Sequence, residues 1–361
     1  MIPYNNTDLP VTIKYDLEMM KLLNTAKELY GKLNAIIAYQ EIDPFLILKP
    51  FILQESYMSS VMSGNKISQS SLYYMKYYEI NDDILEIYNY SDILQNIEKY
   101  LSKNDKITYA YINKIHKDLL RSKRGYMRNP GHTRSKVSWI GRRGSTIDSA
   151  EYVPVAPRDI NESMANYIKH FNKRHSIDHL IDVAISHAQF VNIHPYDDGN
   201  GRVGRILLSV HGFLDHNDHL SILLSSMIKS DEYSYYNRLK DTRNGKWERY
   251  IKFYLELLIK QLNEHIHKID DIRTVYYKDI ISFENIIGKK NYKLVFNYLF
   301  SNITSTIKEA SNDLGIDYQT IRNYSNKLFA KGILAKHKIN NGEYVYTYIK
   351  MYNIHVPIEW I

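Results

Sequence analysis

Residues 194–205 read His194-Pro-Tyr-Asp-Asp-Gly-Asn-Gly-Arg-Val-Gly-Arg205. An apolar segment with helical spacing, 177–193, ends directly before this stretch, and a second helical pattern, 201–215, begins within it. The expected local structure is therefore a helix, a tight loop and another helix. Glycines let the loop turn its N–H groups toward an anion, and the start of the new helix adds the positive end of its dipole. We expect an anion site that suits a polyphosphate.

This stretch resembles the signature of the Fic family, His-Pro-Phe-x-Asp/Glu-Gly-Asn-Gly-Arg-x-x-Arg, with Tyr196 in place of phenylalanine. Fic proteins that resemble it transfer AMP from ATP to a hydroxyl side chain of a target protein. The resemblance implies His194 as general base, Asp198 as the ligand of Mg²⁺ between the α- and β-phosphates, and Arg205 as the ligand of the γ-phosphate. A histidine is a suitable base at neutral pH, and metal and guanidinium charges offset developing negative charge. The rest of the phosphate cradle would be Gly199, Asn200, Gly201 and Arg202.

The segment 137–157 carries short β-like runs on either side of Gly141-Arg-Arg-Gly144, and we expect a β-hairpin there. It resembles the flap of Fic proteins, a hairpin that holds a target segment by strand addition and contacts the nucleotide. The stretch around Tyr236 and Arg243 resembles the part that lines the adenine, although a tyrosine pair on a helix is as often plain core. The flap residues that would face the nucleotide are Ser149, Ala150, Glu151 and Tyr152.

Residues 59–65 read Ser59-Ser-Val-Met-Ser63-Gly64-Asn65. Many Fic proteins carry an inhibitory helix with the pattern Ser/Thr-x-x-x-Glu-Gly/Asn, whose glutamate pairs with the second arginine of the signature. Here Ser63 stands where the glutamate is expected, so the resemblance implies a helix docked beside Arg205 without the inhibiting charge. Removal of AMP is disfavoured, because in proteins resembling this one it relies on that glutamate. The alternative is a capped helix end with no such role.

The length of 361 residues suggests two or three domains. The expected fold class is mainly α: a Fic helical core with a β-hairpin flap, plus a C-terminal winged helix-turn-helix. We expect an N-terminal helical region over 1–105, the catalytic core over 106–270 and the winged helix over 285–361. Apolar spacing predicts further helices over 16–39, 44–63, 82–102, 107–121, 161–174, 231–241 and 246–270.

The C-terminal region carries the pattern of a winged helix-turn-helix. Helices are predicted over 292–300, 307–314 and 318–330, followed by a hairpin that turns at Asn341-Gly342. The alternative to DNA binding is a scaffold or dimerisation role for this region. The third helix would expose four side chains that can contact base edges: Gln319, Arg322, Asn323 and Asn326.

The formal charge of +7 is unevenly spread. Residues 285–361 hold ten Lys/Arg and five Asp/Glu, which suits nucleic acid, and residues 121–143 hold eight Lys/Arg and no acid. Either run can also be a solvated face. No stretch has the roughly 18 uncharged apolar residues of a membrane span, and the first residues lack the pattern of a secretory signal. Because the chain has no cysteine, we expect a cytoplasmic protein without disulfides.

Two classes of function compete. The first is Mg²⁺-dependent transfer of AMP from ATP to a Ser, Thr or Tyr hydroxyl of a target protein, or of the chain itself, by an enzyme that could form homodimers. The second is a DNA-binding transcriptional regulator whose Fic domain is vestigial or serves as a sensor. A variant of the first class keeps the enzyme but changes the donor to another nucleotide or a phosphocholine-linked one. The complete signature from His194 to Arg205 favours the enzyme.

Overall fold

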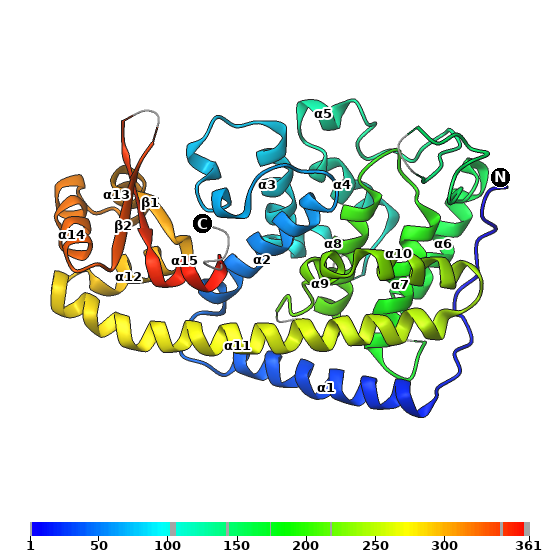
Figure 1. The fold of residues 1–361 in the computed structure, drawn as a ribbon, viewed down its shortest axis with the longest axis horizontal. Helices are drawn as coiled ribbons and strands as arrows, with labels where there is room; N and C mark the ends of the chain where they lie inside the picture. Colours follow the sequence, from blue (N-terminus) through cyan, green and yellow to red (C-terminus); the bar gives the residue numbers. More distant parts are fainter. Residues whose placement is uncertain are drawn as a thin grey trace. The chain divides into compact units, whose positions relative to one another are not determined.

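The computed structural model describes residues 2–101, 106–141, 144–173, 175–216, 219–339 and 342–356. The chain is mainly helical with one small sheet, which confirms the mainly α part of the predicted fold class (Figure 1). None of the described helices combines the length and the apolar character that a bilayer span requires. The chain divides into two compact units. The first unit comprises Met1–Ala35, Glu55–Asn65 and Leu85–Asn263, and the second comprises Ile36–Gln54, Lys66–Ile84 and Glu264–Ile361.

The first unit contains the signature and most of the helices. Helices α1 (Leu17–Ala38), α2 (Pro44–Val61), α3 (Asp82–Gln95) and α11 (Trp247–Ile287) have residues in both units. The helices that lie wholly in the first unit are α4 (Tyr109–Leu119), α5 (Lys123–Tyr126), α6 (Ile160–Phe171), α7 (His179–Ile193), α8 (Asn200–His216), α9 (Ser225–Ser230) and α10 (Glu232–Arg243), with short 3-10 helices at Ile97–Tyr100 and Pro157–Asp159.

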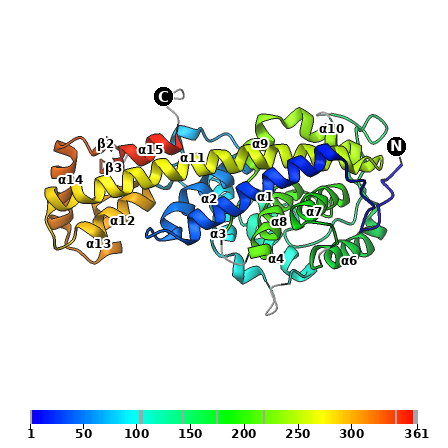
Figure 2. The same ribbon diagram turned by 90° about the horizontal axis from the view of Figure 1, so that it is seen from below.

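Helix α7 lies at the centre of the first unit. All of its residues except Val191 are buried, as expected for a helix that is apolar on most of its surface. It packs against α6 and α8, and α4 in turn contacts α6 and α8 (Figure 2). Asp178 caps its start by accepting the N–H of Leu180 at 3.0 Å. The loop that follows α7 therefore starts from a firmly held helix.

The predicted helices are present with ends shifted by a few residues, except for two. The helix expected over 82–102 ends at Gln95 and continues as a separate 3-10 turn. Helix α11 runs to Ile287 instead of 270. The apolar face of the helix continues through Ile272 and Phe283, which are both buried. The charged residues between them obscured this helical spacing in the sequence. Gly288, with a φ of +86°, follows the last helical residue.

The hairpin predicted over 137–157 is wrong as a pair of strands. The described residues of this segment form one isolated antiparallel bridge, between Ile140 and Tyr152. Ile140 and Tyr152 exchange backbone hydrogen bonds in both directions, at 2.8 and 3.1 Å, but Pro154 and Pro157 have no N–H to extend the pairing. The Tyr152 hydroxyl also donates to the carbonyl of Asn192 in α7. Arg142 and Arg143, at the predicted turn, lie outside the described residues. The segment is a loop fixed to the helical core.

The second unit holds the only sheet found in the described part of the chain. Strands β1 (Thr304–Thr306), β2 (Leu334–Lys338) and β3 (Tyr344–Tyr348) pair antiparallel in the order β1-β3-β2. Its further helices are α12 (Tyr292–Asn302), α13 (Ile307–Leu314), α14 (Tyr318–Ala330) and α15 (Ile349–His355), with 3-10 turns at Gln69–Ser71 and Met75–Tyr77.

The helix–strand–helix–helix–strand–strand order after residue 291 is the order that a winged helix-turn-helix requires, and that interpretation stays a prediction. A capping box between Thr306 and Glu309 starts α13, and Gly315 ends it. Aromatic rings fill the core: Phe283 of α11 contacts Phe296 with centroids 5.0 Å apart. Asn341, at the predicted turn, lies outside the described residues. The compact unit also takes in 36–54 and 66–84, so it is larger than 285–361.

Candidate active site

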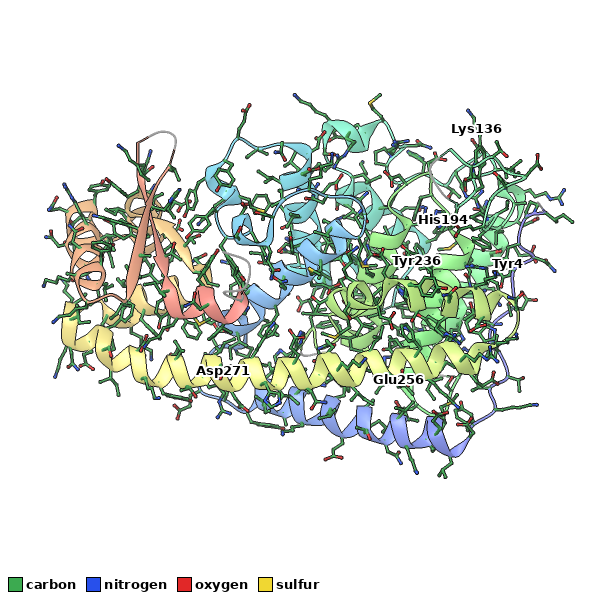
Figure 3. The ribbon with its side chains drawn as sticks, in the orientation of Figure 1. Tyr4, Lys136, His194, Tyr236, Glu256 and Asp271 are labelled. Carbon is green, nitrogen blue, oxygen red and sulfur yellow. The ribbon has the colours of Figure 1, made fainter. Side chains whose placement is uncertain are left out.

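The loop between α7 and α8 begins with a residue in an unusual backbone conformation. His194 ends α7 with φ 54° and ψ 61°, in the left-handed region that residues other than glycine rarely adopt. Its N–H still donates to the carbonyl of Phe190 at 3.0 Å. Figure 3 labels this residue between Lys136 and Tyr236. Such backbone strain persists only where the surroundings fix it, and contacts on both sides of the loop do so here.

The aromatic residue of the signature anchors the loop in the core. Tyr196 is buried, its ring stacks on that of His116 with centroids 3.7 Å apart, and its hydroxyl donates to Asn113 Oδ1 at 2.7 Å. His116 Nδ1 accepts the N–H of Gly131 at 2.9 Å, so the proton lies on Nε2, which donates to the carbonyl of Asp198 at 3.0 Å. Burial lowers the pKa of His116 to about 4. The neutral imidazole therefore ties α4 to the loop.

The side chain of Asn200 closes the loop on itself. Its Oδ1 accepts the N–H of Tyr196 at 2.9 Å, and its Nδ2 donates to the carbonyl of the same residue at 2.7 Å. Gly199, with a φ of +78°, then leads the chain into α8. The amide of Asn200, expected in the phosphate cradle, is thus engaged within the protein. The first N–H groups of a helix have no partner inside it, so those of α8 are the backbone donors that we expect to face an anion.

Arg134 supports the other side of the loop and was not singled out from the sequence. Its side chain is buried, and its guanidinium donates to the carbonyl oxygens of His194 (2.8 Å), Lys136 (3.1 Å) and Val155. Its own N–H donates to the carbonyl of Pro195 at 3.0 Å. The only signal in the sequence is its place in the basic run 121–143, which does not distinguish a buried arginine from an exposed one.

The imidazole of His194 is neutral at neutral pH. Burial and the nearby charge of Arg134 lower its pKa to about 4. A neutral imidazole can accept a proton from a hydroxyl group, whereas an imidazolium cannot. The side chain that the signature predicts as general base is therefore in the protonation state that the role requires.

Asp198 presents a half-exposed carboxylate at the same loop. One oxygen accepts the N–H of Gly199 at 2.6 Å, and the carboxylate lies 3.7 Å from Arg202 Nη2 and 3.9 Å from Arg128 Nε. Within the described ranges, no three His, Asp or Glu side chains gather as metal ligands. Mg²⁺ is usually held by one or two carboxylates together with substrate phosphates and water. A single accessible carboxylate beside the start of α8, where an anion is expected, fits that kind of ion.

The two signature arginines are both buried and face different partners. Arg202 is 3% exposed, and its Nη1 lies 3.1 Å from Glu86 Oε2 of α3. Arg205 is 5% exposed and donates to Ser59 Oγ and to the Ser59 carbonyl, both at 2.8 Å. Its Nη2 also lies 3.4 Å from Ser63 Oγ. The last turn of α2 therefore contacts Arg205, and Ser63, just past the end of the helix, faces the same guanidinium. The inhibitory role expected from the pattern stays a prediction.

Gly201 leaves room for Arg205. A Cβ atom added at this position would meet Arg205 Nη1 at 3.2 Å, which is closer than ordinary contact allows. A side chain here would therefore push the guanidinium away from its present place. Gly201 is a helical residue of α8 and has no positive φ, so its role here is the space that it leaves for Arg205 and not backbone freedom.

The residues expected to line the adenine differ in accessibility. Tyr236 is 51% exposed. The buried part of its side chain raises the pKa of the hydroxyl, and the positive charge of Arg205 opposes that rise. Arg243 lies over the Tyr152 ring at 4.0 Å and donates to Asn192 Oδ1 at 3.1 Å. Tyr236 is therefore available to a ligand, whereas Arg243 is engaged in the core.

Among the four flap residues, Ser149 and Glu151 are exposed. Ala150 and Tyr152 are buried, and the Tyr152 ring also lies 5.9 Å from that of Tyr4. The N–H of Tyr4 donates to the carbonyl of Val153 at 2.9 Å. The inner side of this segment is thus packed against the protein, and only its outer residues can meet a ligand.

Residues 106–212 match the Fic/DOC family. The matched segment is similar to a Fic domain. It holds the loop from His194 to Arg205 together with Arg134 and His116, so the residues that shape the site lie mostly within the matched segment. Glu86, Ser59 and Ser63 precede that segment.

The chain is similar to proteins named protein adenylyltransferase Fic. That of Nematostella vectensis is 26% identical over 255 residues, which cover 68% of this chain and 55% of the relative. That of Aedes aegypti is 24% identical over 168 residues, covering 46% and 30% of the two chains. The chain thus spans about half or less of the length of these relatives.

Solved structures show the same fold. A Fic family protein from Desulfovibrio desulfuricans superposes with a TM-score of 0.62 at 16% identity, over 94% of this chain and 98% of the other. Fic-1 (residues 134–508) from C. elegans superposes with a TM-score of 0.54 at 16% identity, over 70% and 73% of the two chains. The first match extends far beyond the Fic domain itself.

Proposed function

We propose that this chain is a protein adenylyltransferase that transfers AMP from ATP to a Ser, Thr or Tyr hydroxyl of a target protein or of itself. The observation that carries the proposal is the loop that joins α7 to α8. It brings a neutral histidine, an accessible carboxylate and two buried arginines together at the start of one helix. The names of the relatives support the same activity.

In the proposed reaction the target hydroxyl oxygen attacks the α-phosphorus of ATP. A new P–O bond forms to the target, the bond from the α-phosphorus to the bridging oxygen of the β-phosphate breaks, and pyrophosphate leaves. His194, neutral because burial keeps its pKa low, takes the hydroxyl proton. Arg202 and Arg205 would hold the β- and γ-phosphates in line with the attack.

Asp198 would hold Mg²⁺. When bound, the ion would supply positive charge to the phosphate oxygens. The carboxylate is suited to this role because it is half-exposed and its backbone carbonyl is fixed by His116 at 3.0 Å. The nearby Arg128, 3.9 Å from Asp198, adds a second positive charge at the same edge.

The target would dock on the outer side of the segment 137–153. Val137, Trp139 and Ile140 expose apolar side chains within four positions, and the Trp139 indole N–H donates to the carbonyl of Ser145. Apolar groups exposed side by side favour a protein partner over solvent. The main-chain pairing expected of a flap remains part of the proposal.

Intact mass spectrometry after incubation with ATP and Mg²⁺ tests the activity. We expect added AMP on the chain or on a supplied target, and its loss in His194→Ala. His267→Ala is the matched control, because it removes an exposed imidazole from α11. Label that is retained from the α-phosphate but not from the γ-phosphate would establish AMP transfer. Absence of AMP in the native protein with every offered target would count against the proposal.

A second candidate function, DNA binding, is favoured by the surface of the second unit. On α14, Gln319, Arg322, Asn323 and Asn326 are exposed, and β2 adds exposed Lys336 and Lys338. Amide and guanidinium groups on an exposed helix suit base edges, and lysines suit phosphates. Fluorescence anisotropy with labelled duplex DNA tests this. Binding should weaken steeply with salt and fall in Arg322→Ala, and no binding at low salt would leave a scaffold or dimerisation role.

A further inference from the structure

Glu86 of α3 faces the phosphate site from outside the signature. Its side chain is buried, and Oε2 lies 3.1 Å from Nη1 of Arg202. Its other oxygen, Oε1, accepts from Nε (3.1 Å) and Nη2 (2.6 Å) of Arg124 in α5. One carboxylate therefore lies between two guanidinium groups. It offsets part of the positive charge of Arg202 before any phosphate arrives.

The ion pair with Glu86 leaves some hydrogen-bond donors of Arg202 without an acceptor. Its Nε and Nη1 atoms are buried and have no hydrogen-bond acceptor among the described residues, so the contact with Glu86 is an ion pair without good hydrogen-bond geometry. Buried donors without an acceptor are unfavourable, and a guanidinium fork matches the oxygens of a phosphate. A phosphate group could therefore satisfy donors that Glu86 leaves unsatisfied. The carboxylate and the phosphate would compete for the same arginine.

We propose that Glu86 is a counter-ion gate on the phosphate site. By this we mean that its carboxylate pairs with Arg202 in the empty protein and loses that pairing when the triphosphate binds Arg202. The inference rests on the proposed use of ATP. Arg124 makes the exchange feasible, because it keeps Glu86 paired after Arg202 turns to the phosphate. The gate acts on the first signature arginine, whereas the glutamate that Ser63 replaces would act on Arg205.

Isothermal titration calorimetry with Mg·ATP and with inorganic tripolyphosphate tests the gate on the full chain. Glu86→Gln should bind both probes more tightly, by roughly tenfold, because the competing charge is gone. Asp92→Asn is the matched control: it removes the same charge from an exposed position of α3, and its affinity should stay near that of the native chain. Unchanged or weaker tripolyphosphate binding by Glu86→Gln would overturn the gate.

The two readouts separate this inference from the proposed function. Tighter tripolyphosphate binding without AMP transfer would keep the gate and remove the adenylyltransferase. If the native chain transfers AMP but Glu86→Gln binds tripolyphosphate no more tightly than the native chain does, the adenylyltransferase stands and the gate is overturned. If Glu86→Gln does not fold, Arg124→Gln takes its place, since Glu86 is then left to Arg202 alone. It should weaken tripolyphosphate binding more than Arg121→Gln does, and equal losses would overturn the gate.

Discussion

Arg205 and Ser59 are joined by two hydrogen bonds of 2.8 Å, one to the hydroxyl and one to the carbonyl. The guanidinium thus caps the last turn of α2, where carbonyl groups have no partner inside the helix. Ser63, one turn further on, lies 3.4 Å from the same guanidinium. A hydroxyl therefore faces Arg205 at the position where the family pattern has a glutamate, and the inhibitory role of this segment stays a prediction.

Ser63→Glu should therefore inhibit the native activity. A carboxylate at this position can form a charge-assisted pair with Arg205 and compete with the γ-phosphate. With a coupling of about 1–3 kcal/mol, labelling at saturating ATP should slow by roughly five- to a hundredfold. Ser63→Gln, of similar size but uncharged, is the control and should label near the native rate. Equal rates in both variants would mean that charge at this position does not reach the site.

His194→Ala should abolish transfer without abolishing nucleotide binding. The imidazole acts on the target hydroxyl, and a general base contributes about 10²–10⁴ in rate. The labelling rate should fall at least a hundredfold while the Kd for Mg·ATP changes little. A labelling rate within about tenfold of native would contradict the assignment of the base.

Arg134→Lys should lower the turnover rate more than it raises the KM for ATP. The guanidinium contacts three carbonyl groups at once, including that of His194, and an ammonium on a flexible stem cannot reproduce this fork. We expect kcat to fall by roughly ten- to a hundredfold because the base is less well placed. Arg158→Lys, at an exposed position, is the control. A change in KM alone would show that Arg134 does not position His194.

Acid should destabilise the protein before its carboxylates titrate. Burial lowers the pKa values of His116, His187 and His194 from 6.5 to about 4, so between these values the unfolded chain binds more protons than the folded one. The free energy of unfolding should therefore fall as the pH drops from about 6.5 toward 4. Urea midpoints measured near pH 7.5 and near pH 5 check this, and His187→Gln should show a shallower dependence. A midpoint that rises toward acid would have the wrong sign.

Local sequence patterns predicted most of what is local in this molecule. The signature placed the loop between two helices, because a short motif determines the local structure there. The contact of Ser59 with Arg205, 146 positions away, was instead implied by the family resemblance. Helix caps such as Thr306 with Glu309 also follow from neighbouring residues. The sequence alone therefore sufficed for the position of most helices and for the loop between α7 and α8.

What the sequence did not predict depends on contacts between distant residues. Glu86 lies 116 positions before Arg202, and Arg134 lies 60 before His194. Neither stands out, since a glutamate in an acidic helix and an arginine in a basic run resemble ordinary surface charges. The predicted hairpin pairs only at Ile140 and Tyr152, because Pro154 and Pro157, which follow, have no N–H to donate to a longer ladder.

The path of the backbone between the two units has a consequence for gene fusion. The chain passes from one unit to the other after Ala35, Gln54, Asn65, Ile84 and Asn263, and the last of these crossings falls inside α11. A recombination event that fused the Fic segment alone to another gene would leave behind the stretch that holds Ser59 and Glu86. The residues that contact the signature arginines can therefore be lost in one genetic step while the loop from His194 to Arg205 is kept.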